Sequence, residues 1–267
     1  MANLMDPFAE IKREVDVYLE VNDIAVVFGG VRAVDGVSIE FKGGAVNGLI
    51  GPNGAGKTSL LQVIAGSVHP AAGQVLLDNR NITRFGPARR ASHGLIRTFQ
   101  TAKVFGRLSV IDNLLVGLQN QTGDKLSAAL FRRRAWKQEE ELAREYAMGL
   151  LRDFNMENQA HVRAAELSGG QRRIVEYLRS LMAKPRVLLL DEPTVGLAPW
   201  VTERLLHDLR RLREQGLCIV IVEHEMELIR AICDVVNVMA SGKVIASGNF
   251  DEVARNRDVQ DAYLGNQ

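Results

Sequence analysis

The sequence predicts an α/β fold, in which helices cover both faces of a mostly parallel sheet. Short, continuously apolar segments of the kind that form buried strands alternate along the chain with helical stretches. A glycine-rich loop also follows one of these strands and opens a helix. At 267 residues, the chain is long enough for one large domain with a substantial insert.

The N-terminal third predicts strands around a single helix. β-Branched and other apolar residues favour strands over 18–28, 34–41 and 46–50. The helix is expected over 58–65, and a further short strand over 74–77.

The middle of the chain changes to a helical pattern, so we expect a helical insert into the sheet over about 87–165. Within it, the charged stretch 131–151 favours a pair of solvated helices. The run Arg132-Arg133-Arg134 leaves open a contact with phosphate or lipid.

After Ser168 the alternation of strands and helices returns. A hairpin turn at Ser241-Gly242-Lys243 is expected to join the last two strands. The expected helices are 171–183, 202–215 and one before residue 235, and the expected strands are 187–190, 219–222, 235–240 and 244–246.

Composition and charge exclude several classes of protein. Apolar residues make up 46% and charged residues 24%, which excludes a disordered or fibrous chain. The 33 Lys and Arg residues nearly balance the 32 Asp and Glu residues. A nucleic-acid binder usually has a clear basic excess, so we expect no nucleic-acid partner.

Cysteine usage and apolar runs indicate the compartment. Cys218 and Cys233 form no CxxC pair, which favours buried, reduced thiols. No basic start followed by an apolar stretch marks a secretory signal. The longest apolar runs, about six residues, are far below the ~20 that cross a bilayer. We therefore expect a cytoplasmic protein that acts on membranes only through partners.

The strongest local signal is a match to G-x-x-x-x-G-K-[ST] between a strand and a helix. Glycines let backbone N–H groups converge on phosphate oxygens, and the helix N-terminus adds partial positive charge. Lys57 supplies a full charge to the β- and γ-phosphates, and the Thr58 hydroxyl suits Mg²⁺. The residues expected to bind ATP here are Gly51, Pro52, Asn53, Gly54, Ala55, Gly56, Lys57, Thr58 and Ser59.

A second, acidic element follows the predicted strand 187–190, which ends in Asp191 and Glu192. At a strand end, Asp191 can reach Mg²⁺ through water. Glu192 points into the cleft, where it can polarise the attacking water. Such a strand is weak evidence alone, but paired with the glycine loop it predicts a P-loop NTPase.

The kind of P-loop NTPase is indicated by the segment Leu167-Ser168-Gly169-Gly170-Gln171. Here the sequence resembles the ATP-binding cassette (ABC) family, whose signature is this pentapeptide. Physically it is another helix N-terminus, with Ser168 as the cap and two glycines that let the backbone approach an anion. For Ser-Gly-Gly by itself, the alternative is a plain capped helix. The residues expected to bind ATP here are Ser168, Gly169, Gly170 and Gln171.

The resemblance extends to other single positions. Gln100 matches the family's Q-loop glutamine, which senses Mg²⁺ and the γ-phosphate, and His224 matches its switch histidine. Phe28 stands where the family has an aromatic ring that stacks on adenine. A structural histidine and a core phenylalanine are the alternatives. The resemblance thus implies catalytic roles for Lys57, Gln100, Glu192 and His224, and metal contacts for Thr58, Gln100 and Asp191.

One position departs from the family pattern. The family's D-loop carries an aspartate shortly after the catalytic glutamate, whereas this chain has Ala198. Coupling between two ATP sites across a dimer is then expected to be looser or differently built. Because Glu192 is intact, hydrolysis is still expected. A nucleotide-sensing module without turnover is the alternative.

The resemblance covers about residues 19–265 and implies one ABC ATP-binding domain over 17–267, preceded by an N-terminal extension of residues 1–16. The fold implied has a P-loop NTPase core with a mostly parallel sheet, an N-terminal antiparallel β subdomain and a helical insert subdomain. In the family, two ATPase subunits bind head to tail and sandwich two ATP molecules. The resemblance therefore implies a dimer for this chain, either a homodimer or a heterodimer with a paralogous ATPase.

The family also implies membrane partners. A groove beside the helical insert receives a short helix from an integral membrane permease, which would place the chain on the inner face of the membrane. The corresponding segment here is 101–117, whose apolar residues fit the core of the insert equally well. These residues are Val104, Phe105, Leu108, Val110 and Leu114.

Four segments narrow the resemblance to the branched-chain amino-acid importer ATPases, namely 28–34, 94–100, 108–114 and 262–265. This resemblance implies two permeases and an extracytoplasmic substrate-binding protein as direct and indirect partners. None of these segments touches the cargo, so a urea or amide importer and a lipopolysaccharide exporter remain alternatives. A soluble, non-transport ABC ATPase is a further alternative, although such proteins usually carry two cassettes or a long coiled coil.

Overall fold

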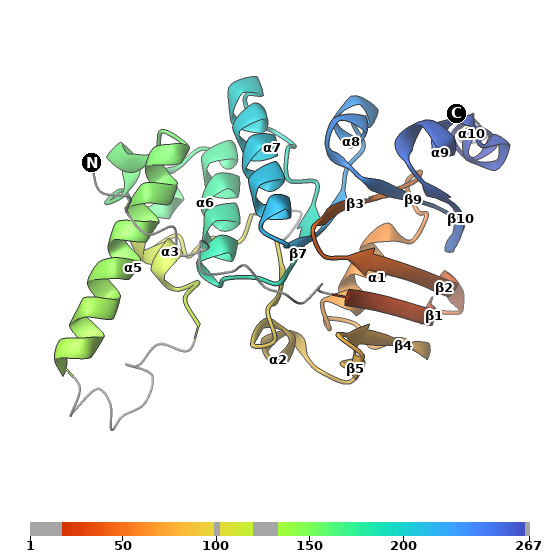
Figure 1. Ribbon diagram of the computed structural model, residues 1–267, viewed down its shortest axis with the longest axis horizontal. Coiled ribbons are helices and arrows are strands. Elements are labelled where there is room, and N and C mark those ends of the chain that lie inside the picture. Colours follow the sequence, from red (N-terminus) through yellow and green to blue (C-terminus); the bar gives the residue numbers. More distant parts are fainter. Residues whose placement is uncertain (1–17, 99–101, 120–132, 265–267) are drawn as a thin grey trace. The chain divides into compact units, whose positions relative to one another are not determined.

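The computed structural model describes residues 18–98, 102–119 and 133–264 (Figure 1). The chain divides into two compact units. The first unit comprises Met1–Arg97, Arg186–Thr194 and Leu205–Gln267, and the second comprises Thr98–Pro185 and Val195–Arg204.

An antiparallel sheet in the first unit has the strand order β2-β1-β4-β5. Buried and more exposed side chains alternate along its two long strands, so one face of the sheet packs on the core. The predicted strands 18–28, 34–41 and 74–77 are confirmed as parts of this sheet. The strands are β1 (Tyr18–Phe28), β2 (Val31–Lys42), β4 (Ala72–Leu77) and β5 (Arg80–Asn81).

A second sheet in the same unit has the order β10-β9-β3-β8-β7-β6. Its neighbouring strands pair in parallel except at the β9–β10 hairpin, where the predicted turn is confirmed. The strands are β3 (Ala45–Ile50), β6 (Leu95–Arg97), β7 (Val187–Asp191), β8 (Cys218–Val222), β9 (Val235–Ala240) and β10 (Lys243–Gly248).

The central strands of this sheet have no polar face. Every residue of β7 and β8 is buried, as is all of β3 after its first residue. Continuous apolar runs of this kind are typical of parallel strands covered on both faces. Because β3, β8 and β7 are parallel neighbours, their carboxyl ends meet at one edge of the sheet, where ligand sites of α/β folds usually lie.

Helices that belong to the first unit include α1, which directly follows the glycine loop. The predicted helix 58–65 is confirmed by α1, and 202–215 by α7, whose residues from Leu205 on lie in this unit. The helices are α1 (Lys57–Ile64), α2 (Pro87–Ala91), α7 (Pro199–Glu214), α8 (Met226–Ile232), α9 (Phe250–Arg255) and α10 (Arg257–Leu264).

A buried arginine stabilises the end of α1. The Arg90 side chain is fully buried, and its guanidinium donates hydrogen bonds to the carbonyl oxygens of Val63, Ile64, Phe85 and Thr83. The last carbonyl groups of a helix have no partner within the helix, and a cation there also favours the helix dipole. Arg90 thus adds donors for the carbonyl groups at the end of α1, of which that of Val63 also accepts from the backbone N–H of Gly66.

The second unit is helical, and α3 packs against both α5 and α6 in it. Val110 and Leu114 are buried, so they belong to the core of this unit, whereas Phe105 and Leu108 are 50% and 37% exposed. The helices are α3 (Val110–Leu115), α5 (Arg133–Asp153) and α6 (Gly169–Met182), and the short 3₁₀ turns are Glu157–Gln159 and Ala164–Glu166.

Two features differ from the sequence prediction in this region. Strand β6 lies within the predicted helical insert 87–165, yet it pairs with β7 in the parallel sheet, and α6 belongs to the second unit. The described part of 131–151 forms one helix instead of a pair, since it consists mostly of strong helix formers and the helix continues through Gly149 to Asp153.

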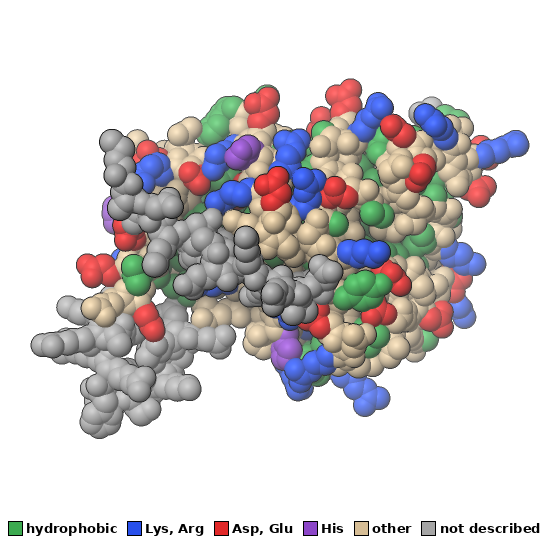
Figure 2. Space-filling model, viewed as in Figure 1, with side chains coloured by type: hydrophobic (Ala, Val, Ile, Leu, Met, Phe, Trp, Pro, Cys, Tyr) green, Lys and Arg blue, Asp and Glu red, His purple; other side chains and the backbone are tan. Residues whose placement is uncertain are grey.

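On the face drawn in Figure 2, basic and acidic side chains are interspersed. Among the described residues, every helix is too short or too polar to span a bilayer.

Candidate active site

The loop between β3 and α1 runs from Gly51 to Gly56 and passes close to other backbone. A Cβ atom at Gly51 would lie 2.0 Å from the carbonyl oxygen of Met239, and one at Gly56 would lie 2.2 Å from that of Ala33. Both glycines also have positive φ angles, of 146° and 98°. Only glycine fits at these two positions, which keeps the loop tight against β2 and β9.

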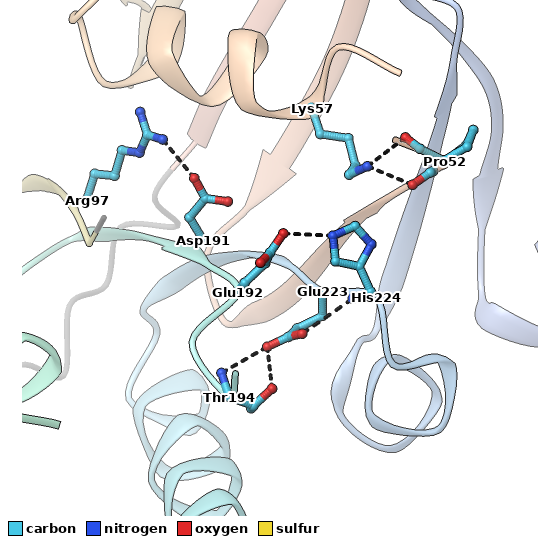
Figure 3. Close-up of polar contacts among 9 residues, drawn as sticks. Pro52, Lys57, Arg97, Asp191, Glu192, Thr194, Glu223 and His224 are labelled. Atoms are coloured by element: carbon cyan, nitrogen blue, oxygen red, sulfur yellow. Dashed lines mark hydrogen bonds and ion pairs between the residues drawn. The ribbon is translucent and has the colours of Figure 1, made fainter. Parts of the chain in front are cut away.

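Lys57 is the first residue of α1 and is buried, with 6% of its surface exposed. Its Nζ donates hydrogen bonds to the carbonyl oxygens of Gly51 and Pro52, at 2.6 and 2.9 Å (Figure 3). Burial lowers the pKa of the Lys57 ammonium, while the charges of Glu192 and Asp191 act to raise it. The cation therefore lies within the loop, with both carboxylates near enough to affect it.

Asp191 is the last residue of β7, and its carboxylate is 2% exposed. It pairs with Arg97 at the end of β6, with 2.8 Å between Oδ2 and the guanidinium Nη2. A buried charge needs such a partner, because desolvation costs several kcal/mol per ion. Arg97 lies in segment 94–100, which contributes to the family resemblance, and it was not predicted as a site residue.

Glu192 follows β7 in the left-handed region, with a φ of 49°. Its Oε1 lies 2.7 Å from Nε2 of His224, which follows β8 (Figure 3). The Glu192 backbone N–H donates to the carbonyl oxygen of Val222 at 2.9 Å. The parallel pairing of β7 and β8 thus brings together an acidic and an imidazole side chain that are 32 residues apart.

Glu223, between Val222 and His224, was not predicted as a site residue. Its carboxylate is 2% exposed and accepts hydrogen bonds at Oε1 from the backbone N–H of Thr194 at 3.0 Å and from its hydroxyl at 2.6 Å. At Oε2 it accepts from the backbone N–H of His224 at 3.3 Å. A charged residue that ends an otherwise apolar strand was the available sequence signal.

The donor types in this part of the first unit suit a magnesium-bound polyphosphate. Glycines 51 and 56 allow close backbone approach, and Lys57 supplies a buried cation. The Thr58 hydroxyl and the Asp191 carboxylate are oxygen ligands of the kind that Mg²⁺ prefers.

The remaining predicted residues lie elsewhere. Phe28 ends β1 and is 46% exposed, so it is not a core phenylalanine. Gln100 lies outside the described residues. Ser168, Gly169, Gly170 and Gln171 belong to the second unit, at the start of α6. The predicted cap is confirmed: the Ser168 side chain accepts from the Gln171 N–H, and the Gln171 side chain accepts from the Ser168 N–H.

Comparison with known families gives two matches. Residues 34–195 match the family described as ABC transporter. Residues 243–267 match the family described as branched-chain amino acid ATP-binding cassette transporter.

Individual relatives agree with these matches. The chain is 36% identical over 248 residues to the high-affinity branched-chain amino acid transport ATP-binding protein BraF of Pseudomonas aeruginosa, covering 92% of this chain and 97% of the relative. It is 33% identical over 248 residues to the corresponding protein LivG of Escherichia coli K12, with the same coverage.

Among solved structures, a nucleotide-free ATP-binding cassette from an ABC transporter superposes with a TM-score of 0.78 at 33% identity, covering 92% of this chain and 98% of the other. An ADP conformation of such a cassette gives a TM-score of 0.76 at 32% identity, covering 93% and 99%.

Proposed function

The chain belongs to the ABC transporter family, and we propose that it is the ATP-hydrolysing subunit of an importer for branched-chain or other hydrophobic amino acids. The single observation that carries the assignment of ATP hydrolysis is the edge of the parallel sheet where β3, β8 and β7 end. Lys57 follows the first of these strands, His224 the second and Glu192 the third. A phosphate-binding cation is thereby combined with an acid–imidazole pair.

We infer that the nucleotide binds along the loop between β3 and α1. The backbone N–H groups of this loop and the N-terminus of α1 favour the negative phosphates. The Lys57 ammonium exchanges its contacts with the loop carbonyls for contacts with the β- and γ-phosphates. The exposed ring of Phe28 is available to stack on adenine. The proposed ATP contacts of this unit are Phe28, Gly51, Pro52, Asn53, Gly54, Ala55, Gly56, Lys57, Thr58 and Ser59.

Glu192 is proposed as the general base for hydrolysis. Its carboxylate accepts a proton from the attacking water, and the hydrogen bond from His224 fixes the orientation in which it does so. Thr58, Asp191 and Gln100 are proposed to hold Mg²⁺, which when bound neutralises charge on the phosphate oxygens. Because Arg97 shares the Asp191 carboxylate, it competes for the same oxygens.

The signature segment is proposed to complete the site of a second subunit. Ser168, Gly169, Gly170 and Gln171 form a capped helix N-terminus in which Gly169 is exposed, and this arrangement suits a phosphate. In a head-to-tail dimer, each subunit contributes its β3–α1 loop to one nucleotide and its signature segment to the other. The second subunit is either another copy or a paralogue.

Permease subunits are proposed to bind the second unit, on the inner face of the membrane. The exposed apolar side chains Phe105, Leu108 and Val116 are suited to receive a short helix from such a subunit. An extracytoplasmic binding protein would then supply the cargo indirectly. The assignment of the cargo is supported by the match of residues 243–267 and by the names of the relatives.

Release of phosphate from MgATP by the purified chain tests the enzymatic proposal. We expect Glu192→Gln to lower turnover about 10²- to 10⁴-fold while ATP still binds, because only the base is removed. The matched control is Glu227→Gln, the same change at an exposed position on α8. Lys57→Ala should abolish tight ATP binding. Unchanged turnover in Glu192→Gln would show that this carboxylate is not the base.

Uptake assays test the cargo. Membrane vesicles that carry the chain together with the permeases and the binding protein from its genomic neighbourhood should accumulate labelled leucine, isoleucine or valine when supplied with ATP. Accumulation of urea but none of these amino acids would contradict the proposed cargo and leave the ATPase assignment intact.

A further inference from the structure

We propose that Glu223 is a positioning residue for hydrolysis, whose carboxylate holds the loop after Glu192 and the loop that bears His224 at a fixed separation. It accepts two hydrogen bonds from Thr194 and one from the backbone of His224. Thr194 is two residues after Glu192, so the Glu223 carboxylate connects the two loops next to Glu192 and His224 (Figure 3).

The backbone around Glu192 has to be held in place by neighbouring groups. Glu192 has a positive φ of 49°, which costs a non-glycine residue energy unless the surroundings hold it. The pairing of β7 with β8 ends at Asp191 and Val222, and after these residues each strand continues as a loop. The backbone bond from Glu192 to Val222 fixes one point, and Glu223 fixes a second point on the far side of Glu192. These two attachments fix the position of Glu192 relative to His224, so that their side chains stay 2.7 Å apart.

The chemistry of the bridge also favours this role. All three hydrogen bonds that Glu223 receives come from N–H or O–H donors, which is what a carboxylate needs. Burial at 2% exposure makes these bonds costly to leave unmade. An apolar residue at this position could not accept these hydrogen bonds, so it would not connect the two loops.

The inference rests on the proposed roles of Glu192 and His224. If Glu192→Gln leaves turnover unchanged, the proposed function fails, whatever Glu223 does. If Glu192→Gln abolishes turnover, variants of the bridge become informative by themselves.

The first measurement is single-turnover ATP hydrolysis by Glu223→Gln, which keeps the size of the side chain but loses an acceptor. We expect hydrolysis to slow by about 10- to 100-fold, as for misplacement of a reacting group by up to about 1 Å. The stoichiometry and affinity of ATP binding should change less than about threefold. Thr194→Val, which lacks the hydroxyl donor, should slow hydrolysis in the same direction, and Thr194→Ser should recover it.

A matched control separates positioning from general destabilisation. Asp208 on α7 is a buried carboxylate at 1% exposure, paired with Arg211. Asp208→Asn should lower the melting temperature without slowing hydrolysis per bound ATP. A loss of hydrolysis in Asp208→Asn equal to that in Glu223→Gln would overturn the inference.

Non-additivity provides the decisive test. The variant His224→Ala has no hydrogen bond between residues 192 and 224. In this variant, Glu223→Gln should therefore slow hydrolysis by less than about threefold further. The ¹⁵N imidazole resonances of His224, assigned by their loss in His224→Ala, should shift in Glu223→Gln and Thr194→Val. A full multiplicative loss, or unshifted resonances in both variants, would refute the positioning role.

Discussion

Replacement of Gly56 by alanine should destabilise the fold through one steric contact. The added Cβ would lie 2.2 Å from the carbonyl oxygen of Ala33, and that atom is backbone of β2, which cannot rotate away. The φ of 98° adds a cost of about 1–2 kcal/mol for any residue with a Cβ. Relief of the clash adds about 1–3 kcal/mol. The expected loss is therefore about 2–5 kcal/mol.

Gly54→Ala is the matched control. Gly54 lies in the same loop with a φ of 78°, but a Cβ there would meet no atom within 4 Å. Only the dihedral cost of about 1–2 kcal/mol applies to it. For a chain of this size, each kcal/mol lowers the melting temperature by about 2–4 °C.

Thermal unfolding without nucleotide, followed by circular dichroism, measures the difference between the two variants. Gly56→Ala should melt about 4–20 °C below the unmodified chain, and Gly54→Ala about 2–8 °C below it. Gly56→Ala should also bind ATP more weakly, because the clash moves the N-terminus of α1. Equal melting temperatures for the two variants would refute the steric argument.

Further predictions concern burial and capping. Arg90→Met should cost about 3–5 kcal/mol, measured by urea unfolding, because buried carbonyls lose their donors. Ser168→Ala should cost about 1 kcal/mol in the same assay by removing the α6 cap. Burial raises the pKa of Cys218 and of Cys233 to about 12, against about 8.5 in an unfolded chain. The buried Cys218 thiol should resist iodoacetamide at about pH 9 until urea is added. The free energy of unfolding should be unaffected below about pH 8.5 and decline as pH rises toward 12. Rapid labelling of Cys218 in the folded protein would contradict the prediction that this thiol is protected.

The architecture of the first unit was largely predictable because its strands are long or fully apolar. Strand-end reasoning also placed Lys57 after β3 and placed Asp191 and Glu192 at the end of β7, two strands whose carboxyl ends the parallel sheet brings to one edge. His224 was predicted as a site residue only from the family resemblance, and in the structure its side chain contacts Glu192.

The parts that sequence reasoning missed depend on tertiary contacts. Strand β6 has three residues, too few for a periodic signal, and it is recognisable only by its pairing with β7. Arg97 and Glu223 look like ordinary charged residues at strand ends. Their importance comes from partners 94 and 29 residues away in sequence, which no local pattern encodes.

The strand order of the parallel sheet affects how the chain folds during synthesis. Strand β8 lies between β3 and β7, so these two cannot take their final places until residue 222 has left the ribosome. At about 5–20 residues per second, the segment around Lys57 waits roughly 10–30 s for that partner. During this interval the nascent chain exposes unpaired apolar strand edges, which invite aggregation. We expect chaperones that bind emerging chains to engage this protein until β8 inserts.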